Sequence, residues 1–403
     1  MNKRILPVFL IVFFFTAQAV KAQVPATTTR PDSSLQLLPK YKVAIFAPLY
    51  LDSAFIGKSY RYGKGFPRFT LQGFEFVQGV QMALDSMPVY GANVSASIFD
   101  AKSYTQPVQT LIANKQLDSF NLIIGNVRDA EYLQLAGFAQ QKHIPFISAT
   151  YPNDGGISAN PFVAIINSTL KAHCEAIYSY ILQNHGSSNI LLVRKPGSQE
   201  DKVASYFHNI NTPDGKGLLS IKTVNIESDS FAVLKPLLDS GRRTIIIGAS
   251  LNEGFAGKLA SYCAELNGLY PTTLFGMPNW DAFSFMNKKN GPKDYNIYFT
   301  IPYYNSRTDG KSRMIKELYR ARFRGNPSDM VYKGYETAQV FTGLLAKYPN
   351  DLMNHLNDYS YKIFTDYNFK PVFLSKDSKV PDYFENKKLY FMKSNNGFIS
   401  RAW

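Results

Sequence analysis

One stretch of the chain places an arginine where it could bind an anion. Residues Leu122–Ile124 form a short apolar run, and Gly125 can adopt the backbone angles of a strand-to-helix corner. A helix is predicted from Asp129 to about Gln141, so Arg128 stands at its N-terminus. A guanidinium beside unpaired backbone N–H groups suits a carboxylate or a phosphate. An ion pair with an acidic residue in the first helical turn would explain Arg128 equally well.

Two hydroxyl side chains come at the end of the next predicted strand. Pro145 precedes the strand Phe146–Ser148, and Ala149 and Thr150 follow it directly. In open α/β sheets, ligands bind where the carboxyl ends of the parallel strands meet. Ser148 and Thr150 could donate hydrogen bonds to a ligand or could cap the local turn. Their position favours the ligand.

Nothing in the chain has the pattern of a catalytic centre. The five histidines are scattered and show no metal-ligand spacing with cysteines or carboxylates. There is no nucleophile elbow, no Walker loop and no Gly-rich dinucleotide fingerprint. We therefore expect neither an enzyme nor a bound metal or cofactor.

Alternating strands and helices must position these residues. After a first strand at Lys42–Tyr50, a helix carries apolar residues at three- and four-residue spacing from Leu71 to Met87. The alternation continues and then restarts with a helix at Thr169. Further strands are predicted at 94–99, 122–124, 146–148, 189–194, 221–226, 244–247 and 272–276. Because 403 residues are too many for one ordinary core, the pattern predicts an α/β protein with two doubly wound lobes.

The N-terminus has the pattern of a secretory signal. Two basic residues precede an apolar run, and small residues offer cleavage after Ala19 or Ala22. A retained membrane anchor is the other interpretation. Residues 1–22 are predicted to be a signal peptide, and residues 23–40, rich in Thr, Pro and Ser, a flexible leader. With no cysteine near the cleavage region, a lipid anchor is not expected, and the mature protein should lie in the periplasm.

The chain is strongly basic, with a formal net charge of +14. This surplus favours anionic neighbours such as wall polymers, lipid head groups or an acidic ligand, or it only confers solubility. Nucleic acid is not an expected partner of an exported chain. The two cysteines, Cys174 and Cys263, could form one disulfide in an oxidising compartment. Two buried free thiols are the safer interpretation.

A long segment from Leu51 to Phe69 follows the first strand. It contains three glycines and the aromatic residues Tyr60, Tyr62 and Phe66. Because it comes after the carboxyl end of a strand, it should lie at the rim of the ligand crevice. There it could cover the ligand or only cover the core.

Eight short segments stand in a characteristic order. They are KVAIFAPLY (42–50), LQGFEFVQGVQMALDSM (71–87), LIIGNVRD (122–129), IPFISAT (144–150), LLVRKP (191–196), IIIGAS (245–250), TLFGMPNW (273–280) and YETAQVF (335–341). This order resembles that of the type I periplasmic solute-binding proteins, such as the leucine/isoleucine/valine-binding protein, over nearly all of Tyr41–Trp403. The combination of FGMPNW, IYFTIPYYN and YKGYETA looks most like the exported Bacteroidetes members. Many of those carry lysin motifs, and none is evident here.

The resemblance implies two lobes that close on a ligand about a hinge, with three chain crossings between them. The crossings are expected near 166–168, 301–305 and 361–366. Lobe 1 would then comprise 41–167 with 306–361, and lobe 2 would comprise 168–305 with 362–403.

The resemblance also implies which residues hold the ligand. In the amino-acid-binding members, a hydroxyl and backbone N–H groups after two neighbouring strands hold the ligand carboxylate. Thr150 and Ser148, with Ala149 between them, match the second of these turns. At the first turn, Asn126 and Arg128 stand where a serine is expected.

Two further candidates come from the second lobe. Ser250 occupies the region that follows the IIIGA strand, where the family carries an aromatic residue. Asp281 is the acid available to hold a ligand ammonium. It could instead cap the helix that follows Trp280.

The sequence therefore predicts an exported, monomeric solute-binding protein that closes on a small polar ligand, amino-acid-like or anionic, for ABC-type uptake or sensing. The alternative is a scaffold associated with the cell envelope or peptidoglycan that has the same fold and little affinity for small ligands. The expected partners are the ligand and either a membrane permease or an envelope protein. A binding protein needs a polar crevice around Arg128, Ser148 and Thr150. In a scaffold, the aromatic residues of 51–69 would fill that crevice.

Overall fold

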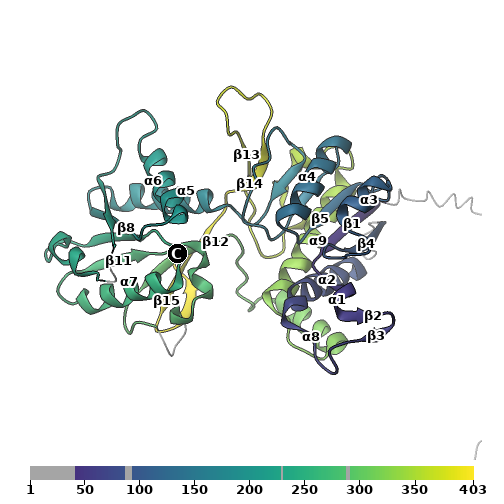
Figure 1. Cartoon of the computed structure of the whole chain (residues 1–403), viewed down its shortest axis with the longest axis horizontal. Coiled ribbons are helices and arrows are strands. Elements are labelled where there is room, and N and C mark those ends of the chain that lie inside the picture. Colours follow the sequence, from purple (N-terminus) through teal and green to yellow (C-terminus); the bar gives the residue numbers. More distant parts are fainter. Residues whose placement is uncertain (1–40, 87–92, 228–229, 287–290) are drawn as a thin grey trace, which may run out of the picture. The chain divides into compact units, whose positions relative to one another are not determined.

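The computed structural model describes residues 41–86, 93–227, 230–286 and 291–403. Within them the chain forms two seven-stranded sheets and one two-stranded hairpin (Figure 1). The expected signal peptide and leader, residues 1–40, lie outside the described residues. The predicted α/β fold class is confirmed, because both sheets are mostly parallel and pack against helices.

The first sheet forms because apolar runs are buried on both of its faces. In β1 (Tyr41–Ala47), the five residues from Val43 to Ala47 are all inaccessible to solvent, as a parallel strand between two helical layers requires. In spatial order the strands are β13 (Phe369–Val372), β14 (Tyr383–Asn386), β7 (Val163–Ile165), β6 (Phe146–Ser148), β5 (Leu122–Gly125), β1 and β4 (Val94–Asp100). The carboxyl ends of β1, β5 and β6 meet at one edge.

The second sheet has its own core. In spatial order its strands are β16 (Phe398–Arg401), β15 (Tyr390–Asn395), β12 (Ile297–Ile301), β11 (Thr272–Phe275), β10 (Thr244–Gly248), β8 (Asn189–Arg194) and β9 (Ile221–Asn225). Cys174 and Cys263 are buried in this core as free thiols, which confirms the safer of the two interpretations.

Helices cover the sheets. On the first sheet, α2, α8 and α9 pack on one face, and α3 and α4 pack on the other, while α5, α6 and α7 contribute to the core of the second sheet. The helices are α1 (Leu51–Ala54), α2 (Arg68–Ser86), α3 (Val108–Ala113), α4 (Asp129–Lys142), α5 (Leu170–His185), α6 (Ser198–Asn211), α7 (Glu253–Leu266), α8 (Gly310–Phe323) and α9 (Asp329–Lys347). None of the described helices is long and apolar enough to cross a membrane.

The expected position of the last chain crossing is wrong. The sequence analysis places all of 362–403 in the second lobe, but β13 and β14 extend the first sheet, and β14 pairs in parallel with β7. Only β15 and β16 join the second sheet, so the yellow C-terminal strands lie in both sheets (Figure 1). A short alternating pattern predicts a strand but not the sheet edge that the strand joins. Pro371 suits β13 because an edge strand needs fewer N–H donors.

The segment 51–69 is also more ordered than a loop. It contains α1 and then a hairpin of β2 (Phe55–Ile56) and β3 (Ser59–Tyr60). Gly57, in the turn of this hairpin, has a φ of 58°, a conformation that side chains with a Cβ disfavour.

Helices α2 and α9 approach so closely that glycine is required where they meet. A Cβ added to Gly334 would lie 2.1 Å from the carbonyl oxygen of Phe76, and one added to Gly79 would lie 2.0 Å from that of Val331. Backbone atoms of a packed helix cannot move aside as a flexible side chain can. These two glycines therefore fix the position of α9 against α2 and the first sheet.

We expect Gly334→Ala to destabilise the protein by at least about 2 kcal/mol, because the methyl group overpacks the helix crossing. Gly137→Ala is the matched control, because a Cβ there meets no atom within 4 Å. Its better helix propensity should add about 0.5–1 kcal/mol of stability. Urea unfolding measures both free energies, and a loss of similar size in the two variants would contradict the close approach.

Candidate functional site

A cavity of about 1110 Å³ is lined by elements that belong to both sheets. Its walls include the N-terminus of α5, one face of α6, the 3₁₀ helix Pro278–Ala282, the end of β12 with the residues that follow it (Thr300–Ser306), and the first two turns of α9. This volume is slightly above the range of about 300–1,000 Å³ in which small-molecule sites usually fall. The cavity is therefore large enough for a small organic ligand.

Lys333 on α9 is a cation of the cavity wall that has no ion-pair partner among the described residues. Its amine lies 4.6 Å from the centre of the Tyr303 ring, and it forms no ion pair with any described residue. Burial lowers the pKa of Lys333, while Asp329 and Asp281 act in the opposite direction. Burial removes water from an ammonium in this position. A ligand carboxylate or phosphate that accepts hydrogen bonds from it would offset that desolvation cost.

Asp281 supplies the opposite charge from another wall of the same cavity. It belongs to the 3₁₀ helix Pro278–Ala282 and makes no ion pair among the described residues. Although its side chain is open to the cavity, the protein around it raises the pKa of the carboxyl group. Desolvation is the main cause, the charge of Asp329 adds to it, and Lys333 opposes it.

Two asparagines line the cavity, and in each of them one amide atom is hydrogen-bonded while the other has no partner among the described residues. Asn279 donates to the carbonyl oxygen of Leu251 (3.0 Å), and its own Oδ1 has no partner among the described residues. Asn305 accepts from the backbone N–H of Arg307 (2.7 Å) and the hydroxyl of Ser312 (2.9 Å), and its Nδ2 has no described partner. The wall therefore offers one neutral acceptor and one neutral donor.

The predicted turn residues lie next to this cavity and do not line it. Thr150 donates to the Oδ1 of Asn126 (2.7 Å), and the carbonyl oxygen of Thr150 accepts from Asn167 (2.6 Å). Asn167 does line the cavity. The carbonyl oxygen of Ala149 accepts from the hydroxyl of Tyr303 (2.7 Å), another lining residue. The turn at 148–150 therefore does not contact the cavity itself. It accepts hydrogen bonds from Asn167 and Tyr303, and these two side chains line the cavity.

The remaining predicted residues have other surroundings. Ser148 is inaccessible to solvent, and its hydroxyl has no described partner. Arg128 is exposed and lies 3.7 Å from the carboxylate of its neighbour Asp129, the contact that the sequence had left open. Ser250 is buried and donates to Glu200 (2.6 Å). Among the residues predicted to bind ligand, Asp281 is the one that lines the cavity.

Lys333 is not among the residues predicted from the sequence, although α9 carries a signal for it. From Val331 to Leu345 on α9, Lys333 and Glu336 are the only charged residues, and nearly every position of this stretch is buried. Glu336 is satisfied by the backbone N–H groups of Phe364 and Thr365 and by the Thr365 hydroxyl. A charged residue inside such an apolar helix needs either a partner or a function.

The aromatic residues of 51–69 do not fill the cavity, because none of the lining residues belongs to that segment. They pack against each other and against Phe74 of α2 instead. Trp280 is also part of the core, with its indole N–H donating to the carbonyl oxygen of Ser250 (2.9 Å). The cavity lining thus remains rich in polar groups.

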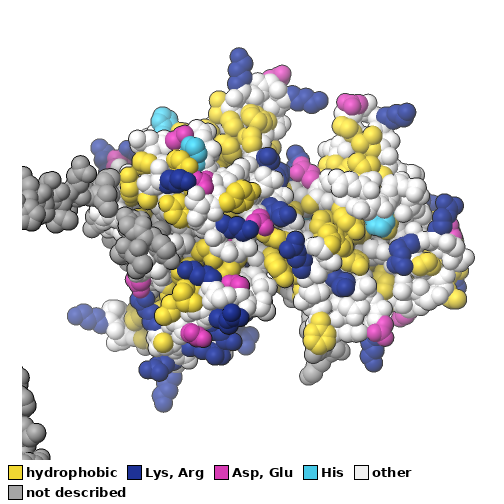
Figure 2. All heavy atoms as spheres, turned by 180° about the vertical axis from the view of Figure 1, so that it is seen from behind, with side chains coloured by type: hydrophobic (Ala, Val, Ile, Leu, Met, Phe, Trp, Pro, Cys, Tyr) yellow, Lys and Arg dark blue, Asp and Glu magenta, His cyan; other side chains and the backbone are white. Residues whose placement is uncertain are grey.

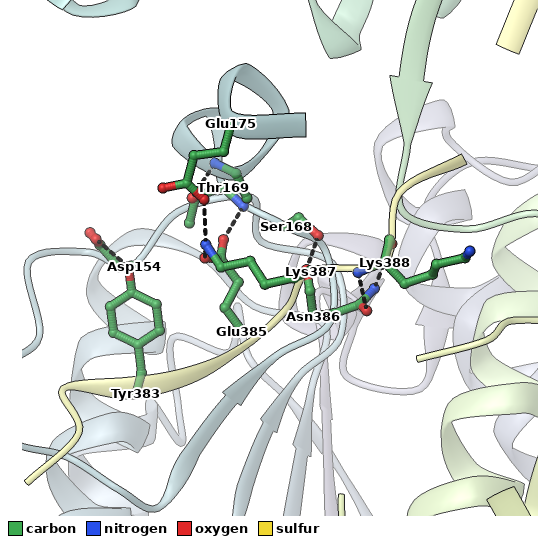
Figure 3. A network of polar contacts seen from close by, with 10 residues as sticks. Asp154, Ser168, Thr169, Glu175, Tyr383, Glu385, Asn386, Lys387 and Lys388 are labelled. Atoms are coloured by element: carbon green, nitrogen blue, oxygen red, sulfur yellow. Dashed lines mark hydrogen bonds and ion pairs between the residues drawn. The ribbon is translucent and has the colours of Figure 1, made fainter. Parts of the chain in front are cut away.

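A polar network joins the first sheet to α5 beside the cavity (Figure 3). The amine of Lys387 lies 2.6 Å from the carboxylate of Glu385 on β14 and 2.9 Å from that of Glu175 on α5. Glu385, which is 1% exposed, also accepts from the backbone N–H of Thr169 (2.7 Å). The hydroxyl of Ser168 donates to the carbonyl oxygen of Asn386 (2.5 Å). Two of the chain segments that run between the sheets are therefore held together here.

We expect Lys387→Met to destabilise the protein by about 3 kcal/mol, because it leaves the buried Glu385 carboxylate without its counter-ion. The neighbouring Lys388 is the matched control, since its amine lies 5.6 Å from the centre of the Tyr390 ring and forms no ion pair with any described residue. Lys388→Met should change the unfolding free energy by less than about 0.5 kcal/mol. If urea unfolding gave the two variants equal stabilities, Lys387 would not be the essential partner of Glu385.

His173 is a second buried ionisable group near this network. Its Nδ1 lies 2.7 Å from the hydroxyl of Thr300. Burial, reinforced by the charge of Lys387, lowers the pKa of His173 from 6.5 to about 3. Between these two values the unfolded chain binds a proton that the folded chain does not bind. The contribution of His173 to stability therefore decreases as the pH falls from about 6.5 towards 3.

Replacing His173 should flatten the pH dependence of stability in this window. A group of this kind contributes a slope of up to about 1.4 kcal/mol per pH unit, so His173→Gln should lose stability less steeply between pH 6 and pH 4 than the parent protein. His143 is exposed, and His143→Asn should keep the parent slope. Urea unfolding at several pH values measures the slopes, and a parent-like slope in His173→Gln would refute the assignment.

Comparison with known proteins agrees with this architecture. The model of a family described as periplasmic binding protein matches residues 69–394. Comparison with curated proteins gives no match. Among the described residues, no group of His, Cys, Asp and Glu side chains could hold a metal ion.

Several solved structures share the fold at low sequence identity. A periplasmic ligand-binding protein of a branched-chain amino acid ABC transporter from Burkholderia xenovorans has a TM-score of 0.57 and 11% identity, over 90% of this chain and 94% of that one. An ABC transporter substrate-binding protein from Desulfitobacterium hafniense, solved with Leu, has a TM-score of 0.55 and 13% identity, over 90% of this chain and all of that one. One from Sphaerobacter thermophilus has a TM-score of 0.54 and 13% identity, over 90% and 96% of the two chains.

The family match covers most of the chain, and the solved structures share its two-sheet arrangement. Both findings confirm the resemblance that the order of the sequence motifs indicates. The chain therefore belongs to the periplasmic binding protein family and has the type I fold.

Proposed function

We propose that this protein is an exported solute-binding protein that holds a small zwitterionic solute, of the amino-acid class, in the cavity lined by both sheets. The observation that carries the proposal is a pair of opposite charges, Lys333 and Asp281, on different walls of that cavity, neither of which has an ion-pair partner among the described residues. A solute with one carboxylate and one ammonium would satisfy both groups. An anion without an ammonium would satisfy Lys333 alone.

In this arrangement Lys333 binds the ligand carboxylate and Asp281 binds its ammonium. The unused Nδ2 of Asn305 and the unused Oδ1 of Asn279 supply neutral hydrogen bonds to the same ligand. Charge-assisted hydrogen bonds are roughly twice as strong as neutral ones, so the two charged residues provide most of the orientation. The turn at Ser148–Thr150 with Asn126 supports the site by holding Asn167 and Tyr303.

The size of the cavity bears on the ligand. A volume of about 1110 Å³ leaves space around a single amino acid, so the cavity either becomes smaller when the lobes close or accepts a larger side chain or a short peptide. Closure adds affinity only through contacts that the open form lacks. Because Lys333 belongs to a helix of the first sheet and Asp281 follows a strand of the second, the ligand would connect the two lobes.

The proposed cellular role is supported by the family match. A periplasmic protein of this class delivers its ligand to a membrane permease of the ABC type or to a sensor. The protein from Desulfitobacterium hafniense was solved with Leu, an amino acid, and this agrees with the class of solute that we propose here. We expect a monomer that has no catalytic activity and no cofactor. The alternative, an envelope scaffold without a small ligand, remains an outcome of the first experiment below.

Thermal unfolding of the purified mature protein against amino acids, short peptides, organic acids and muropeptides tests the proposal. A ligand that binds only the folded state stabilises it by about 2.7 kcal/mol at a hundred times its Kd, and the midpoint should rise with ligand concentration. Hits among amino acids or peptides are expected. If only organic acids raised the midpoint, the proposal that Asp281 binds a ligand ammonium would be wrong. If no compound raised the midpoint and isolated cell wall retained the protein, the scaffold would be the better interpretation.

With a ligand in hand, Lys333→Gln should weaken binding by about 10- to 100-fold, the value of one charge-assisted hydrogen bond. Lys311→Gln is the matched control, because the Lys311 amine also lies over a tyrosine ring, Tyr335 at 5.2 Å, but outside the cavity. Asp281→Asn should weaken the binding of ligands that carry an ammonium and should leave the affinity for ligands without an ammonium unchanged.

Titration calorimetry of the same ligand with Arg128→Ala and Thr150→Ala compares the sequence-predicted site with the cavity. Because Arg128 is exposed and away from the lining, its loss should leave the Kd unchanged. The loss of Thr150 should have a small effect, transmitted through Asn167. A large effect of Arg128→Ala, with Lys333→Gln unaffected, would move the binding site to the start of α4.

A further inference from the structure

A compact part of the surface combines exposed aromatic side chains with lysines and arginines. We call it the basic–aromatic face and define it as residues 51–69 together with α8. In the hairpin segment, Ile56 is 67% exposed and Phe66 is 63% exposed, and Phe55, Tyr62 and Phe69 are also among the exposed large side chains. The nearby Tyr104 is 74% exposed, and its hydroxyl lies 3.1 Å from that of Ser53.

The aromatic side chains are held in place although they are exposed. The Tyr60 ring packs against Phe55, Tyr62 and Phe66 with centroid distances of 5.4–6.1 Å, and the Tyr60 hydroxyl donates to the carbonyl oxygen of Gly65 (2.5 Å). Phe66 in turn packs on Phe74 of α2. The segment is therefore a small preformed cluster, so little conformational entropy is lost when it contacts a partner.

The charges of this face are mostly positive. Residues 55–69 contain Lys58, Arg61, Lys64 and Arg68 and no acidic residue, and residues 310–325 contain six Lys and Arg and one Glu. These four cations of residues 55–69 form no ion pair with any described residue. The nearby carboxylate of Asp52 accepts from the backbone N–H groups of Tyr104 and Thr105 and does not neutralise them.

Helix α8 continues the same face. Phe66 packs on Phe74 of α2, and the Tyr319 hydroxyl of α8 donates to Gln78 (2.8 Å), one turn further along α2. Between its basic residues α8 exposes Met314 and Leu318. In Figure 2, seen from behind, dark-blue Lys and Arg side chains gather at the lower left of the molecule, in the part that contains α8 and the hairpin. Arg322 is the exception there, because it pairs with Asp85.

We propose that the basic–aromatic face docks the protein onto an anionic phospholipid surface. Aromatic side chains with a polar end or flank prefer the boundary between head groups and acyl chains, and lysines and arginines around them bind lipid phosphates. Binding to a membrane surface strengthens with the apolar area that is buried and with the attraction to anionic lipids. The face has both, on a preformed hairpin that the cavity does not use. This inference does not depend on the identity of the ligand.

Sedimentation with lipid vesicles tests the proposal. The purified mature protein should bind vesicles of equal parts phosphatidylglycerol and phosphatidylcholine, should not bind phosphatidylcholine alone, and should be released by added salt because screening weakens surface charge pairs. Each cation near an anionic surface is worth about fivefold in affinity. The double variant Lys58→Glu with Lys64→Glu should therefore lose at least about 20-fold, and Ile56→Ser with Phe66→Ser should also bind more weakly.

Matched controls separate the face from the net charge. Lys216→Glu with Lys222→Glu alters two exposed lysines of the second lobe and changes the net charge equally, and Leu269→Ser removes an exposed apolar side chain elsewhere. Both should bind vesicles as the parent does, and the thermal midpoints of all variants should match. The proposal is overturned if anionic vesicles do not retain the parent, if the charge controls lose as much as the hairpin variants, or if isolated cell wall retains the parent and vesicles do not.

Discussion

The buried carboxylate of Glu385 is the constraint on which the connection between the two sheets depends. It accepts the backbone N–H of Thr169, where the chain enters α5, and it pairs with Lys387, where the chain leaves the first sheet for the second. Lys387 also binds Glu175 on α5. A carboxylate that is 1% exposed must keep these partners or bear a large desolvation cost. Two crossings far apart in the sequence are thereby tied together beside the cavity.

The same physical rule distinguishes structural from functional charges on α9. Glu336 is buried and satisfied, because two backbone N–H groups and a hydroxyl donate to it. Lys333, one turn earlier, has an aromatic ring beneath it and no described counter-ion. The close packing at Gly334 holds α9 against α2, so Lys333 cannot easily withdraw into bulk water. A cation held in this way at a cavity wall is prepared for an anionic group of a ligand.

Charged residues occur in two different settings, the lining of the cavity and the outer surface. Inside the cavity, cations and anions both occur, and most of the anions are already paired or hydrogen-bonded, as Glu175 and Asp154 are. On the outer surface, the excess of positive charge is concentrated in the hairpin segment and α8, which lie on the same helix, α2. The proposed ligand site and the proposed membrane-docking face therefore consist of different residues.

The sequence by itself determined the elements and the fold class. Apolar runs such as Val43–Ala47, the glycine at 125 and the order of the strands and helices were sufficient, because local periodicity reports burial on one or both faces. It also singled out Asp281, which lines the cavity. The tertiary structure alone decided which sheet β13 and β14 join, and it brought Asp281 and Lys333 to one cavity. These outcomes depend on packing between segments far apart in the chain, and such packing leaves no local pattern for a single sequence to reveal.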